Sequence, residues 1–201
     1  MPLEKQPEEQ IFLAPQPVFQ EEGFAGARMQ EIADEADINK SMLHYYYRSK
    51  EKLFLEVFRS SVKKIFPQLI AILSSDDELE AKVKEVVGFY YKTFKKNPYL
   101  PSFVIHEMNQ HPKRFKEFIG SLDIEIPKTF TTQLKEEVEV GRIMPMKPIH
   151  FLINIVSLCL MPVIARTMVQ TLFSLNDEEF ESFLEERKEL VPKIIFSGVQ
   201  T

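Results

Sequence analysis

The stretch MQEIADEADINKSMLHYYYRSKEK, residues 29–52, predicts two short helices joined by a tight turn and followed at once by a third helix. In the first piece the apolar residues recur at i, i+3, i+4 and i+7, which places them on one stripe of a two-turn helix: Met29, Ile32, Ala33 and Ala36. Asp37 and Ile38 interrupt this pattern. Asn39 favours the start of a second helix at Lys40, because its side-chain oxygen can accept a hydrogen bond from a free backbone N–H group.

The outer face of the second helix is unusual. Leu43 and Tyr47 share its inner side, whereas the outer side carries Ser41, His44, Tyr45 and Arg48. A solvated helix face is normally rich in Lys and Glu, but this face combines polar-tipped aromatic rings with basic groups that can reach phosphates and base edges. A helix, a turn of about three residues and a second helix form the geometry that places the second helix in a DNA major groove. The pattern therefore predicts DNA binding.

At these residues the chain resembles the TetR family of bacterial transcriptional regulators, whose N-terminal signature reads approximately GF-x-G-T-[ST]-M-x-x-IA-x-x-AGVSKG-x-LY-x-YF-x-SKE-x-LF. The residues that match in register are Gly23, Phe24, Gly26, Met29, Ile32, Ala33, Ala36, Lys40, Leu43, Tyr46, Ser49, Lys50, Glu51, Leu53 and Phe54. The match covers the first quarter of the chain, and the remainder is similar only in length and helical character. The resemblance implies an all-α fold, a homodimer, double-stranded operator DNA as partner and a small-molecule ligand.

Three departures from the signature bear on the function, and among them Ala27, Pro15 and Pro17 support an alternative. Ala27 stands where the family commonly has Thr, and Asp37 replaces the usual turn Gly, although Asp tolerates a left-handed backbone. Pro15 and Pro17 fall inside the expected first helix, where an interior proline costs about 3 kcal/mol, so we expect a short helix over residues 15–22. The alternative is a helical dimeric interaction module with a degenerate, weak DNA reader.

The expected DNA contacts divide into two kinds. Tyr45 and His44 lie in the middle of the outer face and are expected at base edges or sugars, whereas Lys50, Tyr46 and Arg28 flank it and are expected at phosphates. The complete set of expected DNA-binding residues is Arg28, Asn39, Lys40, Ser41, His44, Tyr45, Tyr46, Arg48 and Lys50.

Composition excludes several other classes. The net charge of −5 argues against a broadly basic nucleic-acid coat protein. Cys159 is the single cysteine, and the N-terminal residues lack the basic and apolar regions of a signal peptide, so we expect a cytoplasmic protein without a membrane partner. The sequence lacks a phosphate loop, a nucleophile elbow and a Cys–His pair, and Gln110 stands where a zinc-protease motif beginning at His106 needs its second His. We therefore expect no enzyme activity, no cofactor and no metal.

The chain is long enough for two units joined by a continuous helix. We expect a three-helix DNA-binding domain over residues 1–55 and a helical ligand-binding and dimerisation domain over residues 56–201. Ser75 with Glu78, and Asn176 with Glu179, predict capping boxes at two helix starts. Gly141 predicts a helix end.

The larger domain has the composition for a ligand pocket and a dimer interface. Aromatic and thioether side chains can line an apolar pocket, and the candidates are Tyr90, Phe94, Phe103, Met108, Phe118, Phe130 and Phe151. The run from residue 149 to 164 is apolar on nearly all sides, so it needs partners on more than one face, and a second copy of the chain can supply one. In the family resembled here the last two long helices form a four-helix dimer interface, which implies contacts by Phe151, Ile155, Phe180, Phe183, Leu184, Val191 and Ile195. The expected function is a repressor released from a palindromic operator by a small, largely apolar molecule.

Overall fold

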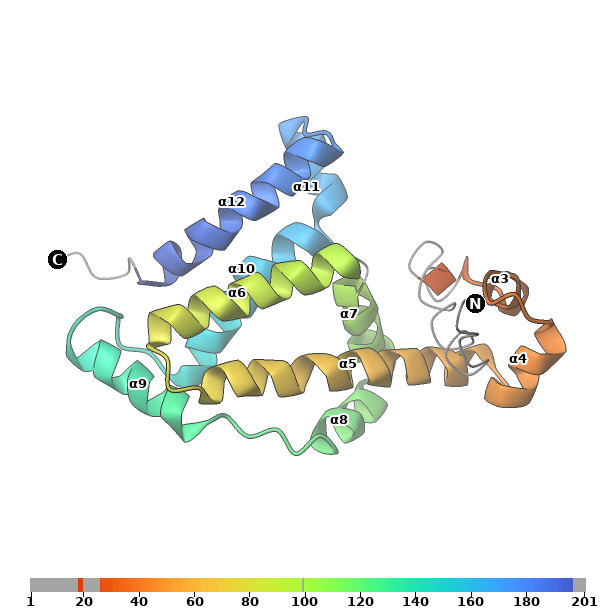
Figure 1. The fold of residues 1–201 in the computed structure, drawn as a ribbon, viewed down its shortest axis with the longest axis horizontal. Coiled ribbons are helices and arrows are strands. Elements are labelled where there is room, and N and C mark those ends of the chain that lie inside the picture. The colour runs from red at the N-terminus through yellow and green to blue at the C-terminus, as the bar shows by residue number, and fades with distance from the viewer. Residues whose placement is uncertain (1–17, 20–25, 99, 197–201) are drawn as a thin grey trace, which may run out of the picture. The chain divides into compact units, whose positions relative to one another are not determined.

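The computed structural model describes residues 18, 19, 26–98 and 100–196, and every regular element in these ranges is a helix (Figure 1). The predicted all-α class is confirmed. The helices are α3 (Met29–Glu35), α4 (Lys40–Tyr47), α5 (Lys50–Ser74), α6 (Leu79–Lys96), α7 (Leu100–Gln110), α8 (Pro112–Gly120), α9 (Lys128–Glu139), α10 (Pro148–Ile164), α11 (Arg166–Phe173) and α12 (Asp177–Phe196). Pro15 and Pro17, and with them most of the expected first helix, lie outside the described residues.

The contacts divide the chain into two compact units. Unit 1 comprises Met1–Ile65 with Phe103–Phe118, and unit 2 comprises Phe66–Ser102 with Ile119–Thr201. Helix α5 continues without a break from the residues of one unit into those of the other, as the sequence predicted for the connection. The assignment of DNA binding to residues 1–55, and of ligand binding and dimerisation to residues 56–201, stays a prediction.

Unit 1 is built on a small core where α3, α4 and the start of α5 meet. Its buried members are Phe19, Ala27, Ile32, Ala33, Leu43, Leu53, Phe54 and Val57. The rings of Phe19 and Phe54 meet edge to face with centroids 5.2 Å apart, a favoured aromatic geometry. The segment from α7 and α8 also belongs to this unit, and the His106 ring of α7 lies 6.5 Å from the Phe54 ring of α5. An ion pair links α7 to α8, because the Arg114 Nη2 lies 2.6 Å from the buried Glu107 carboxylate. A core this small depends on each of its apolar positions.

Unit 2 is organised around α6, which packs against α12, α10 and α9 (Figure 1). The apolar stripe of α6 recurs every three or four residues, as expected for a helix that faces a core, through Leu79, Val83, Val86, Val87 and Phe94. The Arg187 Nη2 of α12 donates a hydrogen bond to the Leu158 carbonyl of α10 at 2.8 Å. Its Nε lies 3.3 Å from the Tyr91 hydroxyl of α6, so one guanidinium ties three helices together.

The helix ends test the predicted caps. At α12 the box is confirmed, because Asn176 Oδ1 accepts from the Glu179 amide at 3.0 Å and the Glu179 carboxylate accepts from the Asn176 amide at 2.8 Å. At α6 the predicted box is wrong. Ser75 Oγ instead donates to the Asp77 carboxylate at 2.9 Å, and the helix begins at Leu79, too late for Ser75 to cap it. Gly141 has a φ of 76°, the left-handed conformation that ends a helix, as predicted for α9.

The long apolar run is broken into two helices. Helix α10 ends at Ile164 and α11 begins at Arg166, with a bend of 69° between them. Within the described ranges no single helix has both the length and the apolar composition to cross a membrane. Only when α10 and α11 are taken together, as a bent pair, do their length and composition reach those of a membrane span.

Candidate DNA reader and ligand pocket

Helices α3 and α4 with the turn between them form the reader, residues 29–47, and the local sequence explains their geometry. Asp37 has a φ of 53°, so the turn uses the left-handed conformation that Asp tolerates. Asn39 Oδ1 accepts a hydrogen bond from the Met42 amide at 2.7 Å, which confirms Asn39 as the N-cap of α4. Leu43 is fully buried and Tyr47 is half-buried. The inner side of α4 is therefore held against the core.

The outer face of α4 is open to solvent. Tyr45 is 81% exposed, and its ring meets that of Tyr46 edge to face at 5.5 Å. His44 Nδ1 lies 3.4 Å from the Arg48 carbonyl oxygen, so with Nδ1–H as donor the Nε2 atom remains an acceptor on the surface. The other exposed members of the predicted set are Lys40, Ser41 and Tyr46 on this helix and Arg48 at its C-cap. The structure thus brings two tyrosines, a histidine and two cations together on one accessible surface.

The flanking residues have structural partners that the sequence did not reveal. Lys50 Nζ donates to the Ala27 carbonyl at 3.0 Å, which links the start of α5 to the segment before α3. Ala27 itself is buried in the core, so the methyl group that replaces the usual Thr has a packing role. The Arg28 amide donates to the Glu31 carboxylate at 2.9 Å, whereas the Arg28 side chain is largely exposed. Lys50 therefore has a structural role, through its hydrogen bond to the Ala27 carbonyl, besides its predicted phosphate contact.

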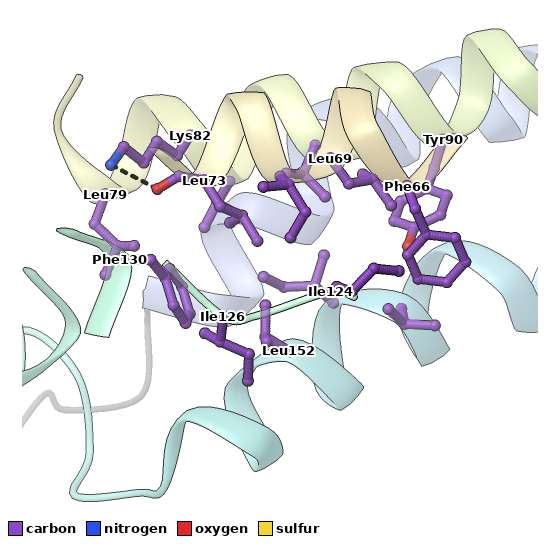
Figure 2. Close-up of a pocket in the computed structure, with 15 residues that line it drawn as sticks. Phe66, Leu69, Leu73, Leu79, Lys82, Tyr90, Ile124, Ile126, Phe130 and Leu152 are labelled. Atoms are coloured by element: carbon purple, nitrogen blue, oxygen red, sulfur yellow. Dashed lines mark hydrogen bonds between the residues drawn. The ribbon is translucent and has the colours of Figure 1, made fainter. Parts of the chain in front are cut away.

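Unit 2 contains a pocket of about 180 Å³, formed by the end of α5, one face of α6, the segment before α9 and part of α10 (Figure 2). A water molecule needs only about 10–15 Å³ by the same measure, so the pocket has room for an organic ligand. Its lining residues are Phe66, Leu69, Ile70, Leu73, Leu79, Lys82, Val83, Val86, Tyr90, Ile124, Ile126, Phe130, Leu152, Ile155 and Val156. All but Lys82 and Tyr90 are apolar.

The pocket overlaps the predicted lining at two positions, Tyr90 and Phe130. Phe94 and Phe151 are buried elsewhere in unit 2, while Met108 and Phe118 belong to unit 1. The side chain of Phe103 lies outside those that the structure describes. Sequence reasoning missed Lys82, although a signal existed, because the lysine follows Leu79 at i+3 on the apolar stripe of α6.

The residues expected at a dimer interface lie mostly inside one protomer. Phe151, Ile155, Phe180 and Val191 are buried in unit 2, and the half-buried members of the set are Phe183, Leu184 and Ile195. The same helices expose a different apolar set, which we call the outer apolar set: Ile149, Ile153, Met161 and Ile164 on α10, and Leu190 and Ile194 on α12.

Cys159 has the environment of a core residue. It is 0% exposed, and burial raises the pKa of its thiol to about 12, with the Arg187 charge lowering it by a smaller amount. A thiol in this state is a poor nucleophile, because the thiolate is the reactive form. Within the described residues no group of three or more His, Cys, Asp and Glu side chains is arranged to hold a metal ion.

These features define a helix-turn-helix protein with a separate helical unit that contains an apolar pocket. Comparison with known proteins shows which proteins the chain is similar to. Residues 17–57 match the model of the bacterial regulatory proteins of the tetR family. Over 82 residues, 40% of this chain, the sequence is 37% identical to the HTH-type transcriptional repressor NicS of Pseudomonas putida. Over 138 residues, 68% of this chain, it is 27% identical to the HTH-type transcriptional regulator RutR of Escherichia coli K12.

The matched stretches span 38% of NicS and 64% of RutR. Solved structures extend the likeness in fold to nearly the whole chain. The transcriptional regulator FadR of Bacillus subtilis, solved in complex with stearoyl-CoA, is similar with a TM-score of 0.66 at 16% identity, covering 96% of this chain and all of that one. PfmR of Thermus thermophilus has a TM-score of 0.67 at 14% identity, covering 95% of this chain and 99% of that one. The match to the model of the tetR family, over residues 17–57, includes the whole reader.

Proposed function

We propose that the protein is a DNA-binding transcriptional regulator, acting as a repressor that a small, largely apolar molecule releases from a palindromic operator. The observation that carries this proposal is the exposed outer face of α4, where Tyr45 and His44 lie on a helix that begins at the Asn39 cap and ends at Arg48. Relatives that match the reader are named as transcriptional repressors. The proposal includes no catalytic step and places the protein in the cytoplasm, where the operator is.

The contacts follow from what each side chain offers. Tyr45 and His44 present a hydroxyl and an imidazole nitrogen that can meet base edges in the major groove, with Ser41 beside them. Lys40 and Arg48 lie at the two ends of α4, and Arg28 is exposed at the start of α3. These cations suit phosphates, and contacts to phosphates fix register without reading sequence. Asn39 and Lys50 can contribute only while keeping their bonds to Met42 and Ala27.

A homodimer would give the palindromic operator its two-fold counterpart. A cluster of exposed apolar side chains on a protein surface commonly marks an interface, and the outer apolar set offers one on α10 and α12. The chain has a net charge of −5, so attraction to phosphates gives one reader little affinity for a single half-site. Two readers in a dimer bind two half-sites together, which raises the affinity for the operator.

An electrophoretic shift with the promoter DNA upstream of the protein's own gene tests the proposal. The wild type should bind this fragment better than a shuffled fragment of equal length. Tyr45→Ala should change the preference between operator variants, whereas Arg28→Ala should weaken binding to all sequences alike and lower the salt dependence by about one phosphate contact. Lys147→Ala is a matched control, because this exposed lysine lies in the other unit.

The alternative function, a dimeric interaction module with a weak reader, predicts a different result. A folded wild type that failed to distinguish genomic promoter fragments from shuffled DNA at low salt would favour that module. The buried position of Ala27 weakens its support, because the residue completes the reader core.

A further inference from the structure

Lys82 is a buried cation in the wall of an apolar pocket. Its side chain is 0% exposed, and it lies among thirteen apolar lining residues and one tyrosine. Removing an ammonium group from water costs several kcal/mol unless an anion or several hydrogen bonds replace the lost solvation. Among the described residues no carboxylate pairs with it, and its hydrogen bond runs from Nζ to the Leu73 carbonyl at 3.1 Å (Figure 2).

This single bond satisfies only part of the hydrogen-bonding capacity of the Lys82 ammonium group. An ammonium carries three N–H donors, and the Leu73 carbonyl takes one of them. Leu73 lies in the last turn of α5, where free carbonyls and the helix dipole attract a cation, so the site compensates part of the desolvation. The two remaining donors point to a missing acceptor.

The Leu73 carbonyl does not depend on Lys82. Thr129 Oγ1, from the first turn of α9, donates to the same oxygen at 3.3 Å. If the lysine turned toward a ligand, the carbonyl would keep a donor. The movement therefore leaves no orphaned acceptor, which makes Lys82 available at low cost.

The rest of the pocket fits the body of such a ligand. Val83 and Val86 line the stretch of α6 between Lys82 and Tyr90, a separation of about 12 Å along the helix axis at 1.5 Å per residue. At the far end the Tyr90 hydroxyl lacks a hydrogen-bond partner among the described residues, and burial raises its pKa, so it remains a neutral donor. Figure 2 shows Lys82 and Tyr90 at opposite ends of the row of apolar side chains.

We propose that the ligand is an unbranched apolar acid whose carboxylate is bound by the Lys82 ammonium and whose chain lies along α6 toward Tyr90. This proposal rests on the proposed function only in taking the pocket as the effector site. It names the chemistry of the effector, an anionic head on an apolar chain, and identifies Lys82 as the residue that selects it.

Calorimetric titration of the full chain with three probes tests the proposal: decanoate, decan-1-ol and decanoyl-CoA, each below its micelle concentration. The wild type should bind decanoate at least tenfold more tightly than decan-1-ol. Lys82→Met should remove this preference by weakening decanoate binding while leaving decan-1-ol binding unchanged. Lys84→Met is the control, because Lys84 is an exposed lysine on the same helix, paired with Glu80, and its loss should preserve the preference.

Several outcomes would overturn the proposal. Equal binding of acid and alcohol by the wild type would do so without any variant, as would tight binding of decanoyl-CoA alone. Retention of the preference in a folded Lys82→Met protein, with its loss in Tyr90→Phe, would assign the head group to Tyr90 instead. DNA release is measured separately: if decanoate bound through Lys82 but left the operator complex intact, the ligand response would fail while the assignment of Lys82 stood.

Discussion

Asp37 holds a left-handed backbone conformation in the turn that sets the angle between α3 and α4. A β-branched residue is strained there by about 1–2 kcal/mol, because its Cβ approaches the next carbonyl oxygen, whereas Asn adopts the conformation nearly as easily as Asp. We expect Asp37→Val to lower the free energy of unfolding by about that amount and Asp37→Asn to leave it nearly unchanged, measured by urea unfolding. Equal stability of the two variants would contradict the assigned turn geometry.

Cys159 predicts a pH dependence of stability. The thiol pKa is about 12 in the folded state against 9.0 for an unperturbed thiol, so above pH 9 the unfolded chain releases a proton that the folded chain keeps. The stability that the raised thiol pKa contributes is therefore complete below pH 9 and is lost as the pH rises toward 12. Over this range the free energy of unfolding falls by at most about 1.4 kcal/mol per pH unit. Urea unfolding under reducing conditions at pH 8 to 10 should show a steeper decline for the wild type than for Cys159→Ala.

The Cys159→Ala variant also leaves a small cavity, but this cost is the same at every pH, so the slopes and not the absolute values are compared. Burial also raises the pKa of the Tyr90 and Tyr91 hydroxyls, but both proteins keep these groups, so their contribution is common to the two slopes. Parallel slopes for the two proteins would show that the thiol is solvated.

At the scale of one element, α4 depends on its cap. Asn39→Ala removes the acceptor of the Met42 amide and should lower the free energy of unfolding by about 1 kcal/mol, because an N-cap side chain contributes roughly that amount. Asn39→Asp keeps an acceptor there and should retain the stability. It also brings a negative charge to the DNA-facing end of the helix, so operator affinity should fall. Urea unfolding and electrophoretic shifts measure the two effects separately.

The comparison of the two variants separates capping from DNA contact. If Asn39→Asp bound the operator as well as the wild type, the start of α4 would lie away from the phosphates, and the predicted DNA contact of Asn39 would be wrong. Its role would then be confined to the helix cap that the structure shows.

At the scale of the whole molecule, the prediction concerns assembly. Ile153 belongs to the outer apolar set and is 54% exposed, so Ile153→Glu leaves the protomer core intact and introduces a charge where a second copy would bury it. We expect sedimentation to show a dimer for the wild type and a monomer for this variant, with a loss of affinity for a two-half-site operator. Val140→Glu is the matched control, because Val140 is exposed and lies outside the set. A monomeric wild type at micromolar concentration would refute the dimer.

Local patterns in the sequence were sufficient to predict the structure of the DNA reader, α3 and α4. The spacing of Ile32, Ala33 and Leu43 predicted the buried sides of α3 and α4, and Asn39 predicted the cap, because these features arise from interactions within three or four residues. The same holds for the all-helical class, for Gly141 at the end of α9 and for the box at Asn176. The failed box at Ser75 shows the limit, since the capping pattern fits the sequence but the Asp77 carboxylate competes for the hydroxyl.

Contacts between distant segments decided the pocket and the exposed surface of unit 2. Periodicity shows that apolar residues share one face of a helix, but it does not show whether that face contacts another helix, a cavity or solvent. Thus Phe151 and Ile155, which we expected at a dimer interface, are buried within one protomer, and Ile149 and Ile153 are exposed. The interface itself stays a prediction. Lys82 also shows that sequence patterns do not reveal which distant segments pack together. Its burial depends on α5, α6 and α9 meeting around the Leu73 carbonyl, an arrangement of residues 73, 82 and 129 that only packing brings together.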